Sequence, residues 1–144
     1  MPDIRNAAFA RAQLDNHGTA LNGGKIEIRE GTSGTLIASF DLPATAMSAA
    51  TGTDDTPGTR SISFADLPYS ATALASSVDN ATDLVALYLN SSEALIFGFD
   101  LVTTAADGTG QVLVTGTIGH DSNTKKPIIT EGNPLNITVG AFTL

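Results

Sequence analysis

The chain has 144 residues, no cysteine and a formal net charge of −8, which fits a single domain held together without disulfides or thiolate metal sites. Its seven basic residues are scattered, with only Lys125 and Lys126 adjacent, so we expect neither nucleic-acid binding nor membrane binding. Only 15% of the residues are charged and 6% are aromatic, and Thr, Ser, Ala and Gly stand where Lys and Glu would be usual, a bias that favours β-structure and loops over long helices.

The first predicted element is a helix over residues 3–16, DIRNAAFARAQLDN. Asp3 is placed to cap it, alanine is dense, and apolar residues recur near one face. Residues 16–18, Asn-His-Gly, supply a plausible stop. The helix either packs on its own domain or is an arm that reaches a neighbouring subunit. The opening residues lack the pattern of a secretory signal, so we expect synthesis in the cytoplasm.

Alternation of apolar and polar residues next predicts a series of short strands. The clearest is residues 25–30, in which Ile26 and Ile28 face inward and charged residues face outward. Residues 44–59 carry few large apolar groups and are expected to form a long surface loop. Residues 70–78 are compatible with a strand or a short helix. Further strands are predicted over residues 35–42, 60–64, 111–117, 128–129 and 135–144.

The most apolar stretch, residues 83–103, predicts a β-hairpin. Two apolar runs, 84–89 and 95–102, flank a polar turn at 90–93. Neither run has a polar face, so both strands are expected where each side is covered, in the middle of a sandwich or under a partner chain. The whole pattern predicts a mainly β fold, an antiparallel sandwich or jelly roll of about eight strands. A short N-terminal helix or arm over 1–23 would precede the β-sandwich domain over 24–144.

Few residues offer catalytic or metal-binding chemistry. His17 and His120 are the only histidines, which excludes a multi-histidine metal site within one chain. Residues 120–122, His-Asp-Ser, contain the residue types of a catalytic triad, but consecutive residues of an extended loop diverge. Asp54, Asp55, Asp100 and Asp107 are the acids that could hold a structural cation. We therefore expect no catalytic residue, no cofactor and no metal, and a protein that binds or builds.

Several segments resemble a family of small β-rich virion proteins of tailed bacteriophages. The run GKIEIREGT at 24–32, followed by GTLIA at 34–38 and LPATAM at 42–47, is similar to the opening of that family. The hairpin at 87–99 stands where the family has strand, polar turn and strand, and NITVGAFT at 136–143 resembles its closing strand. The likeness spans most of the chain.

The resemblance implies a capsid decoration, or cement, protein on the exterior of the virion. Such a protein is not an enzyme: it binds the major capsid protein, stabilises the capsid lattice and acts as a homo-oligomer, either a dimer or a trimer. The helix and the long loop are then the hypothetical partner contacts. The residues placed there are Ile4, Arg5, Phe9, Arg11, Met47, Asp54 and Asp55.

Two other functions remain open. The protein could be a component of a phage tail or fibre that acts as an adaptor or binds a host glycan. Glycan sites usually present exposed aromatic rings, and Tyr69 and Tyr88 are the candidates here. A small hydrolase would need a triad that the sequence does not display.

Overall fold

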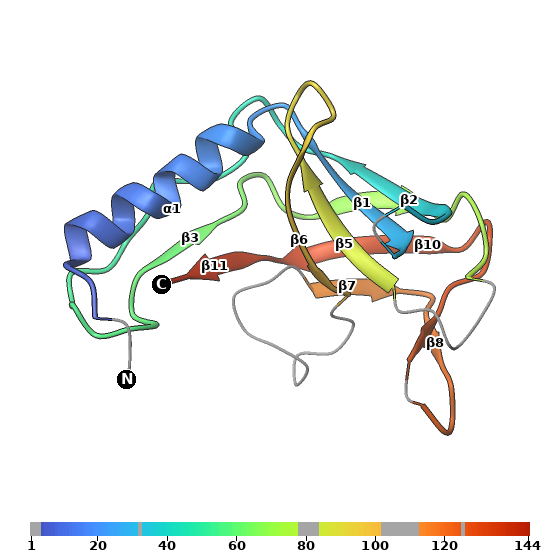
Figure 1. Cartoon of the computed structure of the whole chain (residues 1–144). Helices are drawn as coiled ribbons and strands as arrows, with labels where there is room; N and C mark the ends of the chain where they lie inside the picture. The colour runs from blue at the N-terminus through green and yellow to red at the C-terminus, as the bar shows by residue number, and fades with distance from the viewer. Residues whose placement is uncertain (1–3, 32, 78–83, 102–112, 125) are drawn as a thin grey trace.

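A computed structural model describes residues 4–31, 33–77, 84–101, 113–124 and 126–144. The described part is mainly β, with antiparallel strands and an N-terminal helix, as predicted (Figure 1). Its elements are α1 (Ala7–Leu21), β1 (Lys25–Glu30), β2 (Leu36–Asp41), β3 (Ser61–Ser63), β4 (Tyr69–Thr72), β5 (Leu84–Leu89), β6 (Leu95–Asp100), β7 (Leu113–Gly116), β8 (Gly119–His120), β9 (Pro127–Ile128), β10 (Pro134–Val139) and β11 (Ala141–Thr143).

The helix begins and ends later than predicted. Its N-cap is Asn6, whose side-chain oxygen accepts hydrogen bonds from the backbone N–H groups of Ala8 and Phe9. The expected stop at Gly18 is wrong, because this glycine lies inside the helix and is buried. A Cβ at Gly18 would lie 3.2 Å from both Ile62 Cδ1 and Met47 Cβ, so the glycine permits close packing. The chain turns at Gly23, where φ is +67°.

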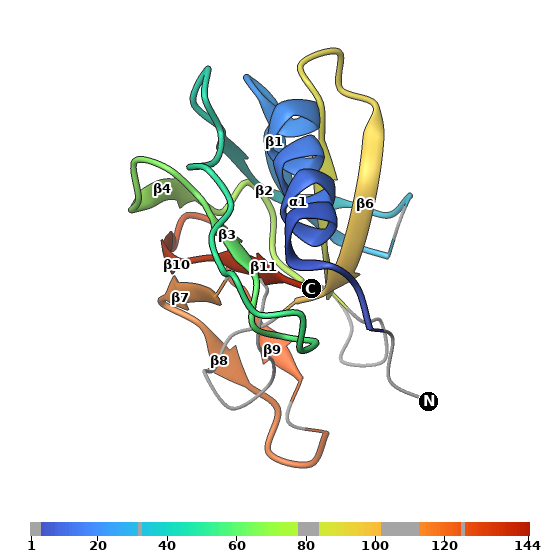
Figure 2. The ribbon, with the colours of Figure 1, turned by 90° about the vertical axis from the view of Figure 1, so that its left-hand side faces the viewer.

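In the described residues, the β-structure consists of two antiparallel sheets and two short ribbons. The larger sheet has the order β2-β1-β5-β6, and the smaller has the order β4-β10-β7. Ribbons β11-β3 and β8-β9 complete the fold. Figure 2 shows α1 lying between the β3-β11 ribbon and β6, with β1 behind it. The helix therefore packs on its own β-domain.

One hydrophobic core joins the helix to both sheets. It includes Leu14 and Leu21 of α1, Ile26 and Ile28 of β1, and Ile137 of β10, all fully buried. The inward positions predicted for residues 26 and 28 are confirmed. Because α1 contributes to this core, the helix and the β-structure form one packing unit.

The predicted hairpin forms, but its two strands differ in burial. β5 pairs with β1 on one side and β6 on the other, and five of its six residues are buried. Among the described strands, β6 is the last of this sheet, and five of its six residues are exposed. The expectation that both strands are covered within a sandwich is therefore wrong for β6. Covering by a partner chain remains a prediction.

Each of the other predicted strands has a counterpart among the described residues. Residues 70–78, left open between strand and helix, contribute β4. The closing strand at 135–144 is divided into β10 and β11. The loop at 44–59 joins β2 to β3 and makes only two isolated bridges to the β3 region. Residues 111 and 112 of the predicted strand at 111–117 lie outside the described residues, as does Asp107.

Candidate functional site

The start of α1 is fastened to the long loop by hydrogen bonds. The backbone N–H of Ala7 donates to Asp55 Oδ1 at 2.7 Å, and Arg11 donates to the carbonyl oxygen of Gly52. The Arg5 guanidinium donates to Gln13 Oε1 at 2.9 Å. Four of the seven predicted contact residues, Arg5, Arg11, Asp54 and Asp55, thus lie at this junction. The two segments chosen from the sequence as separate contact regions form one surface.

A buried arginine that the sequence reasoning did not single out organises this junction. Arg60 is fully buried, and its Nη1 lies 3.0 Å from the Asp54 carbonyl oxygen, 2.9 Å from that of Thr56 and 3.4 Å from that of Arg5. Its Nε and Nη2 have no hydrogen-bond partner within the described ranges. Removing a guanidinium from water costs free energy, which its hydrogen bonds must offset. Arg60 obtains these bonds from the three carbonyl groups, and the bonds in turn hold the loop in place.

Of the three remaining predicted contact residues, two are exposed and one is buried. Ile4, just before the helix, and Phe9, in its first turn, are 71% and 60% exposed. Met47 is buried in the core below Gly18, so its side chain is not available at the surface in this structure. We call Ile4, Phe9 and the polar junction around them the helix-start surface.

The edge strand β6 is a second exposed apolar surface. Leu95, Ile96 and Phe99 are 54%, 36% and 37% exposed. Phe97 faces the interior, with ring-centroid distances of 5.0 Å to Tyr88 and 5.2 Å to Phe142. These aromatic contacts hold the strand in place while its outer side chains meet solvent. The sequence signal for this surface was the lack of a polar face on residues 95–102.

His17 connects α1 to the same aromatic cluster. Its ring centroid lies 5.4 Å from that of Phe97 and 6.3 Å from that of Phe142. Its Nδ1 is buried without a hydrogen-bond partner in the described part of the chain. Burial lowers the pKa of His17, because the charged imidazolium is disfavoured among these rings. Burial therefore favours the neutral imidazole of His17 in the folded state.

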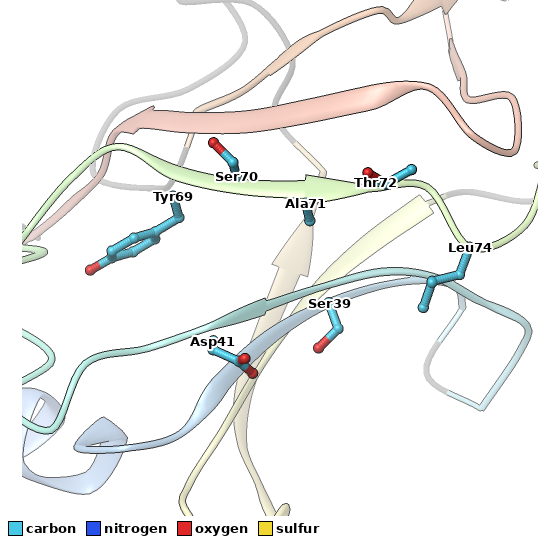
Figure 3. Close-up of a pocket in the computed structure, with 7 residues that line it drawn as sticks. All are labelled: Ser39, Asp41, Tyr69, Ser70, Ala71, Thr72 and Leu74. Atoms are coloured by element: carbon cyan, nitrogen blue, oxygen red, sulfur yellow. The ribbon is translucent and has the colours of Figure 1, made fainter.

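A groove of about 470 Å³ lies between β2 and β4, the edge strands of the two sheets (Figure 3). Its lining residues are Ser39, Asp41, Tyr69, Ser70, Ala71, Thr72 and Leu74. The Tyr69 hydroxyl donates to the Ala65 carbonyl oxygen, and burial, with a smaller effect of Asp66, raises the pKa of Tyr69 to about 12. Tyr69 and Tyr88 are both buried, so neither offers the exposed ring that a glycan site usually uses.

Two of the acidic residues considered for catalysis or cation binding, Asp54 and Asp121, hold local turns. Asp121 Oδ1 accepts from the backbone N–H groups of Thr124 and Asn123, and these bonds lower the pKa of Asp121. Asp54 Oδ1 accepts from the Thr56 hydroxyl and backbone N–H, which lowers the pKa of Asp54. Within the described ranges, no group of three or more His, Asp or Glu side chains is arranged to hold a metal ion.

Comparison with known proteins gives no match to any family model, curated protein or solved structure. In the described part of the chain, the helix is too short and too polar to cross a bilayer.

Proposed function

We propose that this chain is a bacteriophage capsid decoration protein that binds the major capsid protein and stabilises its lattice from outside as a homo-oligomer. The observation that carries the proposal is the helix-start surface, where Ile4 and Phe9 are exposed beside a fixed polar junction. Exposed apolar groups surrounded by polar ones are typical of protein interaction sites. We choose the major capsid protein as the partner of this surface because the sequence resembles small virion proteins.

The binding mechanism depends on a surface that is already ordered. The Asp55 carboxylate and the Arg60 guanidinium tie the loop to the helix start, so little conformational entropy would be lost on docking. Ile4 and Phe9 would enter apolar depressions on the capsid subunit, while Arg11 and Asp54 would lie at the rim. Many copies on one shell would multiply a modest affinity, because each oligomer could engage several sites at once.

A binding assay with expanded, undecorated heads tests this function. We expect the double variant Ile4→Ser, Phe9→Ser to bind heads at least about tenfold more weakly, since exposed apolar anchors carry most interface energy. Val139→Ser is the matched control, because Val139 is 58% exposed on β10 and is not part of the helix-start surface. Deleting the whole helix would be a poor test, because Leu14 belongs to the core.

Quantifying the protein on purified particles separates the proposed function from its alternative. A decoration protein is expected in many copies on heads that lack tails. Recovery only on tails would support the adaptor or glycan-binding function instead. Equal head binding by the double variant and the wild type would reject the helix-start surface as the contact.

A further inference from the structure

The free edge of β6 has the properties of a subunit interface. Within the described residues, β5 pairs with one side of β6 and no strand pairs with the other. Natural proteins usually protect such an edge with lysine, proline or a covering segment. The sequence of β6, LIFGFD, contains neither lysine nor proline, and its only charge is Asp100 at the last position. Three of its apolar side chains are at least one-third exposed.

The hydrogen-bond pattern identifies which backbone groups face outward. The Leu101 N–H donates to the Leu84 carbonyl oxygen at 3.0 Å, so these two residues form a hydrogen-bonded pair. In an antiparallel ladder, every second residue of a strand forms such a pair with the same neighbouring strand. Phe99 is two residues before Leu101, so its N–H and C=O groups also point toward β5. The N–H and C=O groups of Gly98 and Asp100 therefore point to the free edge.

We propose that two copies of this chain associate through β6, antiparallel about a two-fold axis at Gly98, to form one continuous eight-stranded sheet. The Gly98 N–H of each copy would donate to the Gly98 carbonyl of the other. On the face that carries the aromatic cluster, Phe97 of each copy would meet Phe99 of the other. This inference specifies the homo-oligomer, and it stands whether or not the protein binds capsids.

A second copy fits this edge, because the two-fold arrangement pairs the outward Gly98 N–H and C=O groups with each other and brings no like charges into contact. Each copy carries a net charge of −8, so two copies can approach closely only through a surface with little charge. The two-fold arrangement places Asp100 beside Ile96 of the other copy. The two Asp100 side chains would then be about 13 Å apart along the strands, beyond the Debye length at physiological salt.

The size of the contact predicts reversible association. A single strand pair buries less than the roughly 800 Å² per partner of a standard stable interface. We therefore expect a dissociation constant on the order of 10 µM. Sedimentation equilibrium of the full chain over a range of concentrations measures this directly. A wild-type protein that remains monomeric throughout, or that forms trimers, would overturn the proposal.

Charge reversal across the edge tests both the interface and its register. In Ile96→Glu the new carboxylate faces Asp100 of the other copy twice per dimer, and we expect the dissociation constant to rise at least about tenfold. Adding Asp100→Lys to that variant should return it to within about threefold of wild type. Unchanged association of the single variant would overturn the interface, and failure of the double variant to recover would overturn the register at Gly98.

Two controls keep these results interpretable. Val139→Glu introduces the same charge at an exposed apolar position on β10, outside β6, and should leave association unchanged. Equal weakening by Val139→Glu would show that net charge alone controls association and would overturn the role of β6. Ile96 is partly exposed, so circular dichroism and thermal unfolding should confirm that each β6 variant remains folded.

Discussion

At the scale of single residues, Arg60 is the strongest candidate for a structural role. Replacing it with Met leaves the carbonyl oxygens of Arg5, Asp54 and Thr56 without their donor, and we expect the free energy of unfolding to fall by about 2–4 kcal/mol. Urea unfolding measures this loss. The control Arg29→Met removes a partly exposed arginine bound to Glu27 and should cost less than about 1 kcal/mol. Equal losses would contradict the role of Arg60.

His17 makes folding stability depend on pH. Its pKa is lowered in the folded state by burial, so between this value and the ordinary value of 6.5 the unfolded chain binds more protons. The free energy of unfolding should therefore decrease as the pH falls below 6.5. We expect His17→Leu to remove this dependence. Unfolding midpoints measured from pH 7 to about 5 test it, since carboxylates such as Asp54 protonate mainly at lower pH. A decrease that persists in His17→Leu would contradict this assignment.

The buried position of Arg60 could have been predicted from its spacing. Arg60, Ile62 and Phe64 occupy alternate positions, so an inward Ile62 and Phe64 place Arg60 on the same inner face. What the spacing could not supply is its set of partners. The carbonyl groups that it contacts come from the helix start and the long loop, and only the tertiary fold brings these together.

At the scale of elements, the start of α1 depends on Asn6 as its N-cap. Its side chain satisfies two backbone N–H groups that would otherwise lack partners, so Asn6→Ala should lower the free energy of unfolding by about 1 kcal/mol. Asn16→Ala is the control, because Asn16 is exposed within the helix and alanine is the better helix former there. Thermal unfolding compares the two. Equal destabilisation would contradict the N-cap assignment.

Local pattern predicted the strands more reliably than their burial. The alternation in β1 specifies both the strand and its inner face, because one side carries charges. β5 and β6 are both largely apolar in sequence, yet among the described strands β5 is central and β6 is an edge. Strand order depends on which segments pair across the sheet, and a local pattern does not contain this information. The exposed apolar side chains of β6 are those that the proposed interface would cover.

At the scale of the whole molecule, the fold brings together segments that are separate in the sequence. The helix and the loop were chosen as two separate contact regions, and the fold joins them through the Arg60 contacts. With only 15% of its residues charged, the composition favours contact between subunits. It could not show that the exposed apolar groups gather at the helix start and at β6.

Salt provides a test of how the whole charge distribution acts on self-association. Two copies with a net charge of −8 repel each other, while the proposed β6 contact is apolar and hydrogen-bonded. Raising sodium chloride from about 0.05 to 0.5 M shortens the Debye length and should strengthen dimerisation several-fold. Sedimentation equilibrium in both buffers measures the change, with Ile96→Glu as the control that should remain the weaker associator at each salt concentration. Weaker association at high salt would mean that attractive ion pairs hold the dimer, which an interface centred on β6 does not contain.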